Sequence, residues 1–177
     1  MNRRTFLLGA TTTVFAAAGA AWWLLPDPAE RERRRIRTRL LDLAKALSFT
    51  EKDSPFLRMG YAERVTRFFD ETVDLDLTVG PYVATESLHR SRMPEGLAGL
   101  RLGNRGLVVE FIDIAVELSD ATLDPAAVRP TASAHLTSRI YFTGDRDYWV
   151  QEFRFELVRA AGDWLVRGVA TVKTMER

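Results

Sequence analysis

The spacing of apolar residues changes once along the chain, from helical periodicity to alternation. Helical spacing over 29–48 predicts an amphipathic helix that begins after Pro28. A polar break follows, and Pro55 suits the first turn of a second helix that we expect to reach about Phe69. Strict alternation over Thr72–Val79 then predicts a half-buried strand.

The second half is predicted to consist mainly of strands. After Gly80-Pro81, we expect a third helix from Ala84 to about Leu102, broken or kinked in the middle by Pro94 and Gly96. Four extended segments follow, separated by residues typical of turns: 107–118, 128–142, 148–158 and 164–174. The first of them is almost continuously apolar, which is typical of a central strand.

Three stretches of this pattern resemble the nuclear transport factor 2-like superfamily, also called SnoaL-like. They are Phe68 to Leu77 at a helix-to-strand junction, the strand Val108–Leu118, and Phe155–Val169 with its Gly-Asp-Trp turn. The resemblance covers roughly residues 29–176. It implies an α+β fold in which N-terminal helices pack on a curved antiparallel sheet to form a cone. The superfamily includes isomerases, dehydratases, cyclases, transport adaptors and membrane-tethered secretion scaffolds, so the resemblance implies no particular reaction.

A different pattern precedes this domain and divides the chain into a segment 1–27 and a domain 28–177. Residues 5–25 carry no charge, and a helix of that length would span roughly 31 Å, about one hydrocarbon core. Just before and within its start, Arg3, Arg4, Phe6 and Leu7 resemble the twin-arginine export signal. Either such a signal or a signal anchor fits, and Ala18-Gly19-Ala20 offers a cleavage site.

The arginines on the two sides of this segment give opposing indications of orientation. The cluster from Arg31 to Arg39 outnumbers Arg3 and Arg4, and the positive-inside rule alone would keep the domain in the cytoplasm. The leading arginine pair favours export instead. We therefore expect a location in the inner membrane or periplasm of a bacterium, with the C-terminal domain outside the cytoplasm.

Charge and cysteine content narrow the chemistry. The formal net charge of +1 divides into +5 up to Arg39 and −4 over residues 40–177, so the domain is an improbable nucleic-acid binder. The chain has no cysteine, which excludes disulfides, thiolate metal sites and a cysteine nucleophile. Its two histidines, His89 and His135, come without a metal-binding motif, and we expect neither a metal nor a cofactor.

Only a few residues could carry chemistry inside such a cone. Asp113 interrupts an apolar strand, while His135 and Tyr141 share one face of another, and these three form the candidate pocket. An apolar cavity could raise the pKa of a carboxyl group there and make it a useful acid. The competing explanation for Asp113 is a bulge or a hydrogen-bonded strand position. For His135 it is a solvent-exposed face of the sheet.

Three functions remain open. The favoured hypothesis is a membrane-tethered or exported, non-catalytic domain that binds a partner protein or a small apolar ligand in an envelope process, and that could form a homodimer through its sheet. The second is an exported isomerase- or dehydratase-like enzyme that uses Asp113, His135 or Tyr141. The third is a purely structural scaffold whose cone is filled by side chains.

Overall fold

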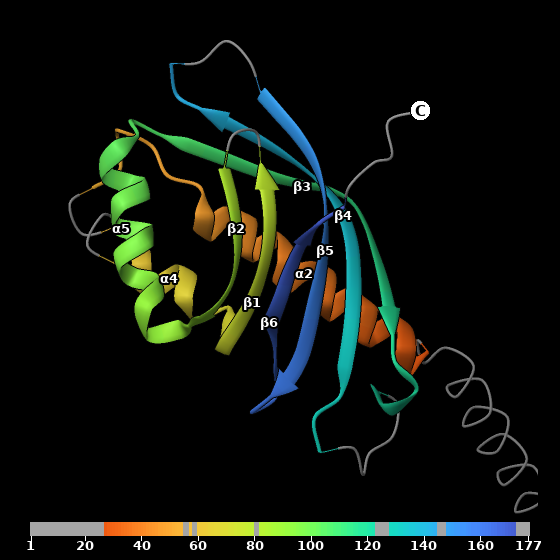
Figure 1. Cartoon of the computed structure of the whole chain (residues 1–177). Coiled ribbons are helices and arrows are strands. Elements are labelled where there is room, and N and C mark those ends of the chain that lie inside the picture. Colours follow the sequence, from red (N-terminus) through yellow and green to blue (C-terminus); the bar gives the residue numbers. More distant parts are fainter. Residues whose placement is uncertain are drawn as a thin grey trace, which may run out of the picture. The chain divides into compact units, whose positions relative to one another are not determined.

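The computed structural model describes residues 27–54, 57, 60–79, 82–122, 128–144 and 148–172. The chain divides into two compact units, residues 1–32 and 33–177. Helix α2 (Pro28–Leu47) crosses this boundary and confirms the first predicted helix. The sheet and the core packed against it belong to the second unit (Figure 1).

The second unit is a six-stranded sheet with helices on one side. Its strands are β1 (Phe69–Val79), β2 (Tyr82–His89), β3 (Leu107–Leu118), β4 (Thr131–Phe142), β5 (Tyr148–Ala160) and β6 (Asp163–Thr171). They are arranged in the order β2-β1-β6-β5-β4-β3. The helices are α2, α4 (Tyr61–Thr66) and α5 (Met93–Gly103), with short 3-10 turns at Arg90–Arg92 and Asp120–Thr122. The α+β class is therefore confirmed.

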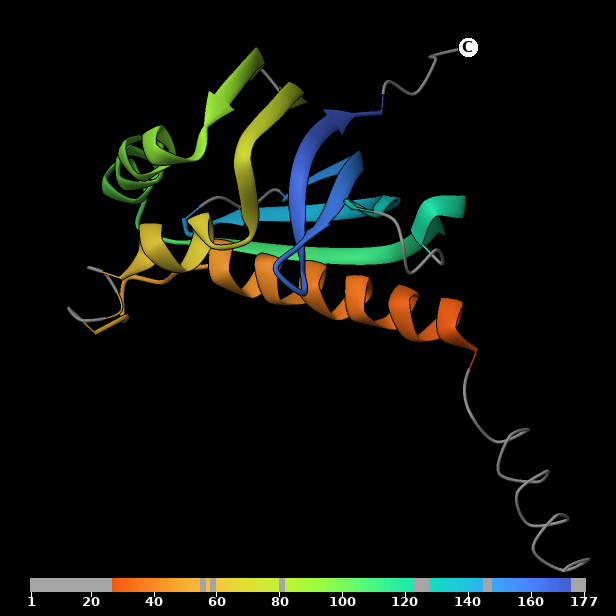
Figure 2. The same cartoon turned by 90° about the horizontal axis from the view of Figure 1, so that it is seen from below.

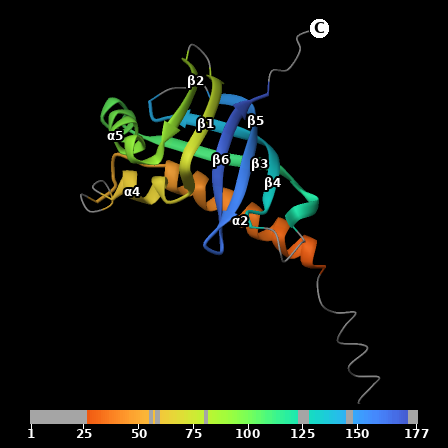
Figure 3. The same cartoon turned by 60° about the horizontal axis from the view of Figure 1, so that its bottom comes forward.

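The sheet is mixed, which corrects the expectation of an antiparallel one. Strands β3 to β6 form an antiparallel meander, and β1 and β2 form an antiparallel hairpin. However, β1 runs parallel to β6, with Leu75 opposite Val169. The two blocks join there because the last strand returns between β5 and β1, so that the earliest and latest strands lie side by side (Figure 3).

The prediction of a helix over residues 84–102 is wrong for its first half and right for its second half. Its first part is strand β2, which pairs with β1 along its whole length, from Tyr82 opposite Val79 to His89 opposite Thr72. Its second part is α5, in which Pro94 occupies the first turn. Proline lacks the N–H that the first turn leaves unpaired anyway, so Pro94 starts a helix where we expected it to break one.

Strand β3 lies at the edge of the sheet, although its apolar sequence predicted a central position. Its bounds match the prediction, but β4 is the one strand that pairs with it among the described residues. Helix α2 runs along the concave face of the sheet, beside β3 (Figure 2). The helix helps to bury inward-facing side chains of β3, such as Leu107 and Phe111, which accounts for the apolar sequence of an edge strand.

The core lies between α2 and the concave side of the sheet. Ile36, Leu40 and Leu43 of α2 are completely or almost completely buried, each contributing roughly 1.5 to 3 kcal/mol by leaving water. The rings of Phe111 and Phe155 face them from the sheet, with centroids 5.6 Å apart. This apolar stripe on α2 supplies the buried contact between the helix and the strands.

The second predicted helix is confirmed in part, at Leu57 and in α4. Of the predicted stretch 55–69, the structure has α4 over Tyr61–Thr66, with Tyr61 and Val65 buried. Pro55 lies outside the described residues. The chain is already extended at Phe69, the first residue of β1.

Candidate functional site

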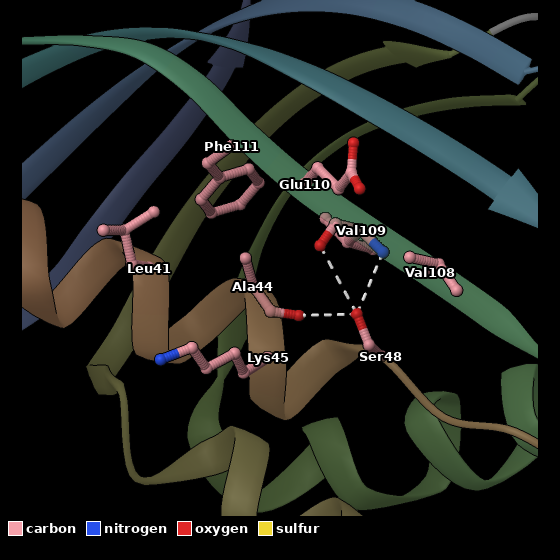
Figure 4. Close-up of a pocket in the computed structure, with 8 residues that line it drawn as sticks. All are labelled: Leu41, Ala44, Lys45, Ser48, Val108, Val109, Glu110 and Phe111. Carbon is pink, nitrogen blue, oxygen red and sulfur yellow. Dashed lines mark hydrogen bonds between the residues drawn. The ribbon is translucent and has the colours of Figure 1, made fainter.

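An open groove lies between α2 and β3 (Figure 4). Its volume is about 420 Å³, within the usual range for ligand pockets. The lining residues come from the end of α2, from the residue after it, and from four consecutive positions of β3. They are Leu41, Ala44, Lys45, Ser48, Val108, Val109, Glu110 and Phe111.

The groove runs along the free edge of β3. Successive residues of a strand point to opposite faces of the sheet, yet Val108, Val109, Glu110 and Phe111 all line the same space. Only a space beside the strand can be reached from both faces. The edge position of β3 in the sheet agrees with this geometry.

One end of the groove is closed by residues that follow α2. The Phe49 N–H donates to the Leu107 C=O at 2.8 Å, and the Leu107 N–H donates to the Phe49 C=O at 2.9 Å. Two residues further along the edge, the Ser48 hydroxyl accepts the Val109 N–H at 2.9 Å. The same hydroxyl lies 2.9 Å from the Ala44 C=O and 3.4 Å from the Val109 C=O, either of which can accept its proton.

Further along the edge of β3, Arg37 contacts the backbone of the strand. Its Nε atom donates to the Ile114 C=O at 3.4 Å. Between Val109 and Ile114, the next residue of β3 whose backbone faces this edge is Phe111, because alternate residues of an antiparallel strand point the same way. No residue in the described part of the chain gives the Phe111 N–H or C=O a partner on this side.

Charge is confined to the rim. Lys45 lies 3.4 Å from the carboxylate of Asp42, its neighbour one turn earlier in α2. Glu110 is exposed on the other wall and lies opposite Arg139 of β4. The walls between these charges are apolar, so the groove suits an apolar group more than a charged one.

Asp113 does not line this groove. It is exposed, its φ is +54°, and the pairing of β3 with β4 shifts register between Ile112 and Ala115. These are the features of a β-bulge, the competing explanation for Asp113 in the sequence. An aspartate tolerates positive φ better than most residues do.

His135 and Tyr141 lie on the outer face of β4, away from α2. His135 is exposed and its strand neighbours are Ala115 and Arg154. Tyr141 is half-buried, with its ring centroid 5.4 Å from that of Tyr148. Six steps of extended chain separate His135 from Tyr141, roughly 20 Å. Both are on one face, as predicted, but they are at distant places on it.

A cluster that the sequence did not indicate surrounds Arg101 of α5. Its guanidinium lies 4.7 Å from the centre of the Phe49 ring and 5.2 Å from that of Tyr61. Nη2 donates to Asp53 Oδ2 at 3.1 Å, whereas Nη1 is buried without a partner among the described residues. The cluster joins residues 49–61 to Arg101, which comes 40 positions after Tyr61, so no local motif could have revealed it.

Burial perturbs two groups of this cluster. Burial raises the pKa of Tyr61 to about 12, and the positive charges of Arg101 and Arg64 offset only part of that rise. Burial also acts to raise the pKa of Asp53, but it is outweighed by hydrogen bonds from Thr50 and Arg101, so the pKa is lowered. Tyr61 is therefore held neutral and Asp53 is held ionised, as suits structural roles.

The predicted export residues Arg3, Arg4, Phe6 and Leu7 and the segment 5–25 lie outside the described residues. Within the described part, no helix has both the length and the apolar character needed to cross a bilayer. No group of three potential metal ligands occurs there either.

No protein-family model matches the sequence, and no curated protein matches it. Solved structures do match. One is a "putative aromatic ring hydroxylase" from Novosphingobium aromaticivorans, with 14% identity and a TM-score of 0.58 over 85% of this chain and 93% of that one. Another, from the same organism, is a "Putative Scytalone Dehydratase", with 17% identity and a TM-score of 0.55 over 85% and 89%.

A third similar structure carries the fold name itself. It is a nuclear transport factor 2-like protein of unknown function from Pseudomonas putida, with 12% identity and a TM-score of 0.55 over 83% of this chain and 89% of that one. At these identities the matches establish architecture and leave the reaction open. The helices on a curved mixed sheet thus form a nuclear transport factor 2-like fold.

Proposed function

We propose that this chain is a non-catalytic binding domain, exported or anchored through residues 5–25, that holds an apolar ligand or partner segment in the groove between α2 and β3. The observation that carries the proposal is the lining of that groove. Leu41 is 43% exposed there, beside Ala44, Val109 and Phe111. Exposed apolar surface in a concave site is a common mark of binding.

The polar groups of the groove support binding over catalysis. The Ser48 hydroxyl is occupied by backbone groups on both sides, and Lys45 is paired with Asp42. A nucleophile needs a base within hydrogen-bond reach, and no side-chain base lies within that distance of Ser48 among the described contacts. The net charge of −4 over residues 40–177 argues against nucleic acid as the occupant.

Site-specific photocrosslinking in cells tests the binding role. A benzophenone amino acid replaces Leu41 in the full chain, and the matched control carries it at Leu102, which is 89% exposed on α5. We expect a recurrent adduct, identified by mass spectrometry, at position 41 only. Equal adducts at both positions, or none at position 41, would contradict a binding role for the groove.

The export or membrane anchoring of the chain is a separate part of the proposal and needs its own test. The double substitution Arg3→Lys and Arg4→Lys should abolish export of a C-terminal reporter if the pair belongs to a twin-arginine signal. The control substitution, Arg33→Lys with Arg34→Lys, preserves charge in the later cluster. A reporter active only in the cytoplasm, fused to the unaltered chain, would reveal the opposite orientation.

The outer face of the sheet is the surface we propose for a homodimer. Tyr148 and Val150 are 53% and 54% exposed on β5, next to Tyr141 and Arg139 of β4. The substitution Val150→Glu should shift the mass in solution from dimer to monomer. A mass that is monomeric before the substitution would remove this part of the proposal.

A further inference from the structure

We infer that the groove binds an extended peptide segment of a partner protein, which adds a short strand to the free edge of β3 at Phe111. This inference rests on the proposed binding function and names the chemical class of the occupant. The segment would accept a hydrogen bond from the Phe111 N–H and donate one to the Phe111 C=O. Addition of a strand to an exposed sheet edge is a general mode of peptide recognition.

The alternation of hydrogen bonds along β3 supplies the first argument. Gly106 accepts the Thr143 N–H from the β4 side, whereas Leu107 is bonded to Phe49 on the opposite side. Val109, two residues on, is bonded to Ser48 on that same side. The backbone of Phe111 therefore also faces the groove, in register with a row of which the first two positions are already paired.

Two bonds to the edge of β3 limit the length of the segment. Ser48 occupies the edge at Val109, and Arg37 occupies it at Ile114. Five steps of extended chain separate these two residues, roughly 17 Å. A partner can thus pair fully with one residue of β3 and extend only a residue or two beyond it.

The walls of the groove define the side chains of the segment. A residue opposite Phe111 would point to the same face as Phe111 and would meet Leu41 and Ala44 of α2. Its neighbours would point to the outer face, where Glu110 lies exposed at the edge. The favoured segment therefore carries an apolar residue of modest size flanked by a basic residue that complements Glu110.

The probe is the labelled peptide acetyl-Val-Lys-Val-Thr-Val-amide, added to the full-length chain in lipid nanodiscs, with empty nanodiscs as the blank. Fluorescence anisotropy measures its affinity. We expect Leu41→Glu to weaken binding about tenfold or more, because it places a charge in the apolar wall, while Leu102→Glu changes it less than about twofold. Glu110→Gln should weaken binding and reduce its dependence on salt.

A second probe isolates the backbone pairing. An analogue with ester linkages in place of its amides keeps the side chains but cannot donate to the Phe111 C=O, and we expect it to bind about tenfold more weakly. Hydrogen exchange should meanwhile show new protection in residues 107–118 when the amide peptide binds. Both readouts are specific to strand addition.

Other results would overturn the inference in distinguishable ways. Equal binding of amide and ester peptides would mean that the groove takes apolar groups without strand pairing, which leaves the proposed function intact. Self-association that Leu41→Glu abolishes would make a second copy of the chain the occupant. Peptide binding that Leu41→Glu leaves unchanged would place the site elsewhere, and no peptide binding together with no adduct at position 41 would remove both the inference and the proposed function.

Discussion

Ser48 holds the edge of the sheet through Val109, whose backbone N–H donates to the Ser48 hydroxyl at 2.9 Å. The two residues are 61 positions apart, so this bond fixes the end of α2 against β3. It also satisfies a donor that an edge strand would otherwise leave open.

Removal of this hydroxyl should destabilise the domain. Ser48→Ala leaves the half-buried Val109 N–H without a partner, and we expect a loss of about 1 to 3 kcal/mol in the free energy of unfolding. Urea denaturation followed by circular dichroism measures it. Ser133→Ala is the control, because the Ser133 hydroxyl donates at 3.5 Å to an exposed carboxylate, that of Glu117, rather than accepting a backbone N–H. Equal losses in the two variants would contradict the role assigned to Ser48.

The ionisation of Asp53 should make the free energy of unfolding depend on pH in the acid range. Its pKa is lowered in the folded state by bonds from Thr50 and Arg101, so it stabilises the fold above its unfolded pKa of about 4, and that contribution is lost as the pH falls through the lower, folded value. We expect Asp53→Asn to be less stable at pH 7 and to lose less stability than the parent between pH 5 and 2. Chemical denaturation across this range checks this expectation, with Glu152→Gln, a substitution of an exposed side chain of β5, as the control.

The ionisation of Tyr61 should make the free energy of unfolding fall as the pH rises in the alkaline range. Its pKa is raised to about 12, so the contribution of the neutral phenol is present below the unfolded pKa of about 10 and is lost as the pH rises through the folded value. Tyr61→Phe keeps the ring but removes the hydrogen bond to the Leu47 C=O at 2.9 Å, at a cost of about 1 kcal/mol at pH 7. The difference between parent and variant should narrow above pH 10. A constant difference up to pH 12 would show that the phenol ionises equally in both states.

The β5–β6 hairpin offers a stabilising substitution. Ala161 and Gly162 form its two-residue loop, with φ values of 52° and 90°. Asn-Gly is favoured where both residues have positive φ, so Ala161→Asn should raise the free energy of unfolding by about 0.5 to 1 kcal/mol. Gly162→Ala should lower it. Thermal denaturation of both variants makes the comparison, and a destabilised Ala161→Asn protein would contradict this account of the turn.

Much of the fold could be predicted because its strands have one solvent-exposed face and one buried face. Alternation located β1, β4 and β5 to within a few residues. Strand β2 was missed because Ala84, Glu86 and Leu88 are good helix formers, and its strand state comes from pairing with β1. The edge position of β3 was missed because an apolar run indicates burial without saying whether a strand or a helix provides the cover.

The candidate site was less predictable because it depends on contacts across the sequence. The groove forms where residues 41–48 meet residues 108–111, and neither stretch carries a motif. The free backbone groups of Phe111 follow from the register that Phe49 and Ser48 impose on β3. Asp113, His135 and Tyr141 were chosen by residue type and by the face of a strand, which says nothing about how far apart the side chains lie or whether the face borders a cavity.

The parallel pairing of β1 with β6 has a consequence for how the domain acquires its structure. The β3 to β6 meander needs only neighbouring strands, and its hairpins can close early after synthesis. Strand β1 must wait, because Phe69 pairs with Val166 and Asp76 pairs with Ala170, each more than 90 residues later. Until β6 has left the ribosome, the β1–β2 hairpin is a separate two-stranded piece of marginal stability. Completion of the sheet is therefore the slow, non-local step of folding, and a translocation route that accepts only folded cargo would have to wait for it.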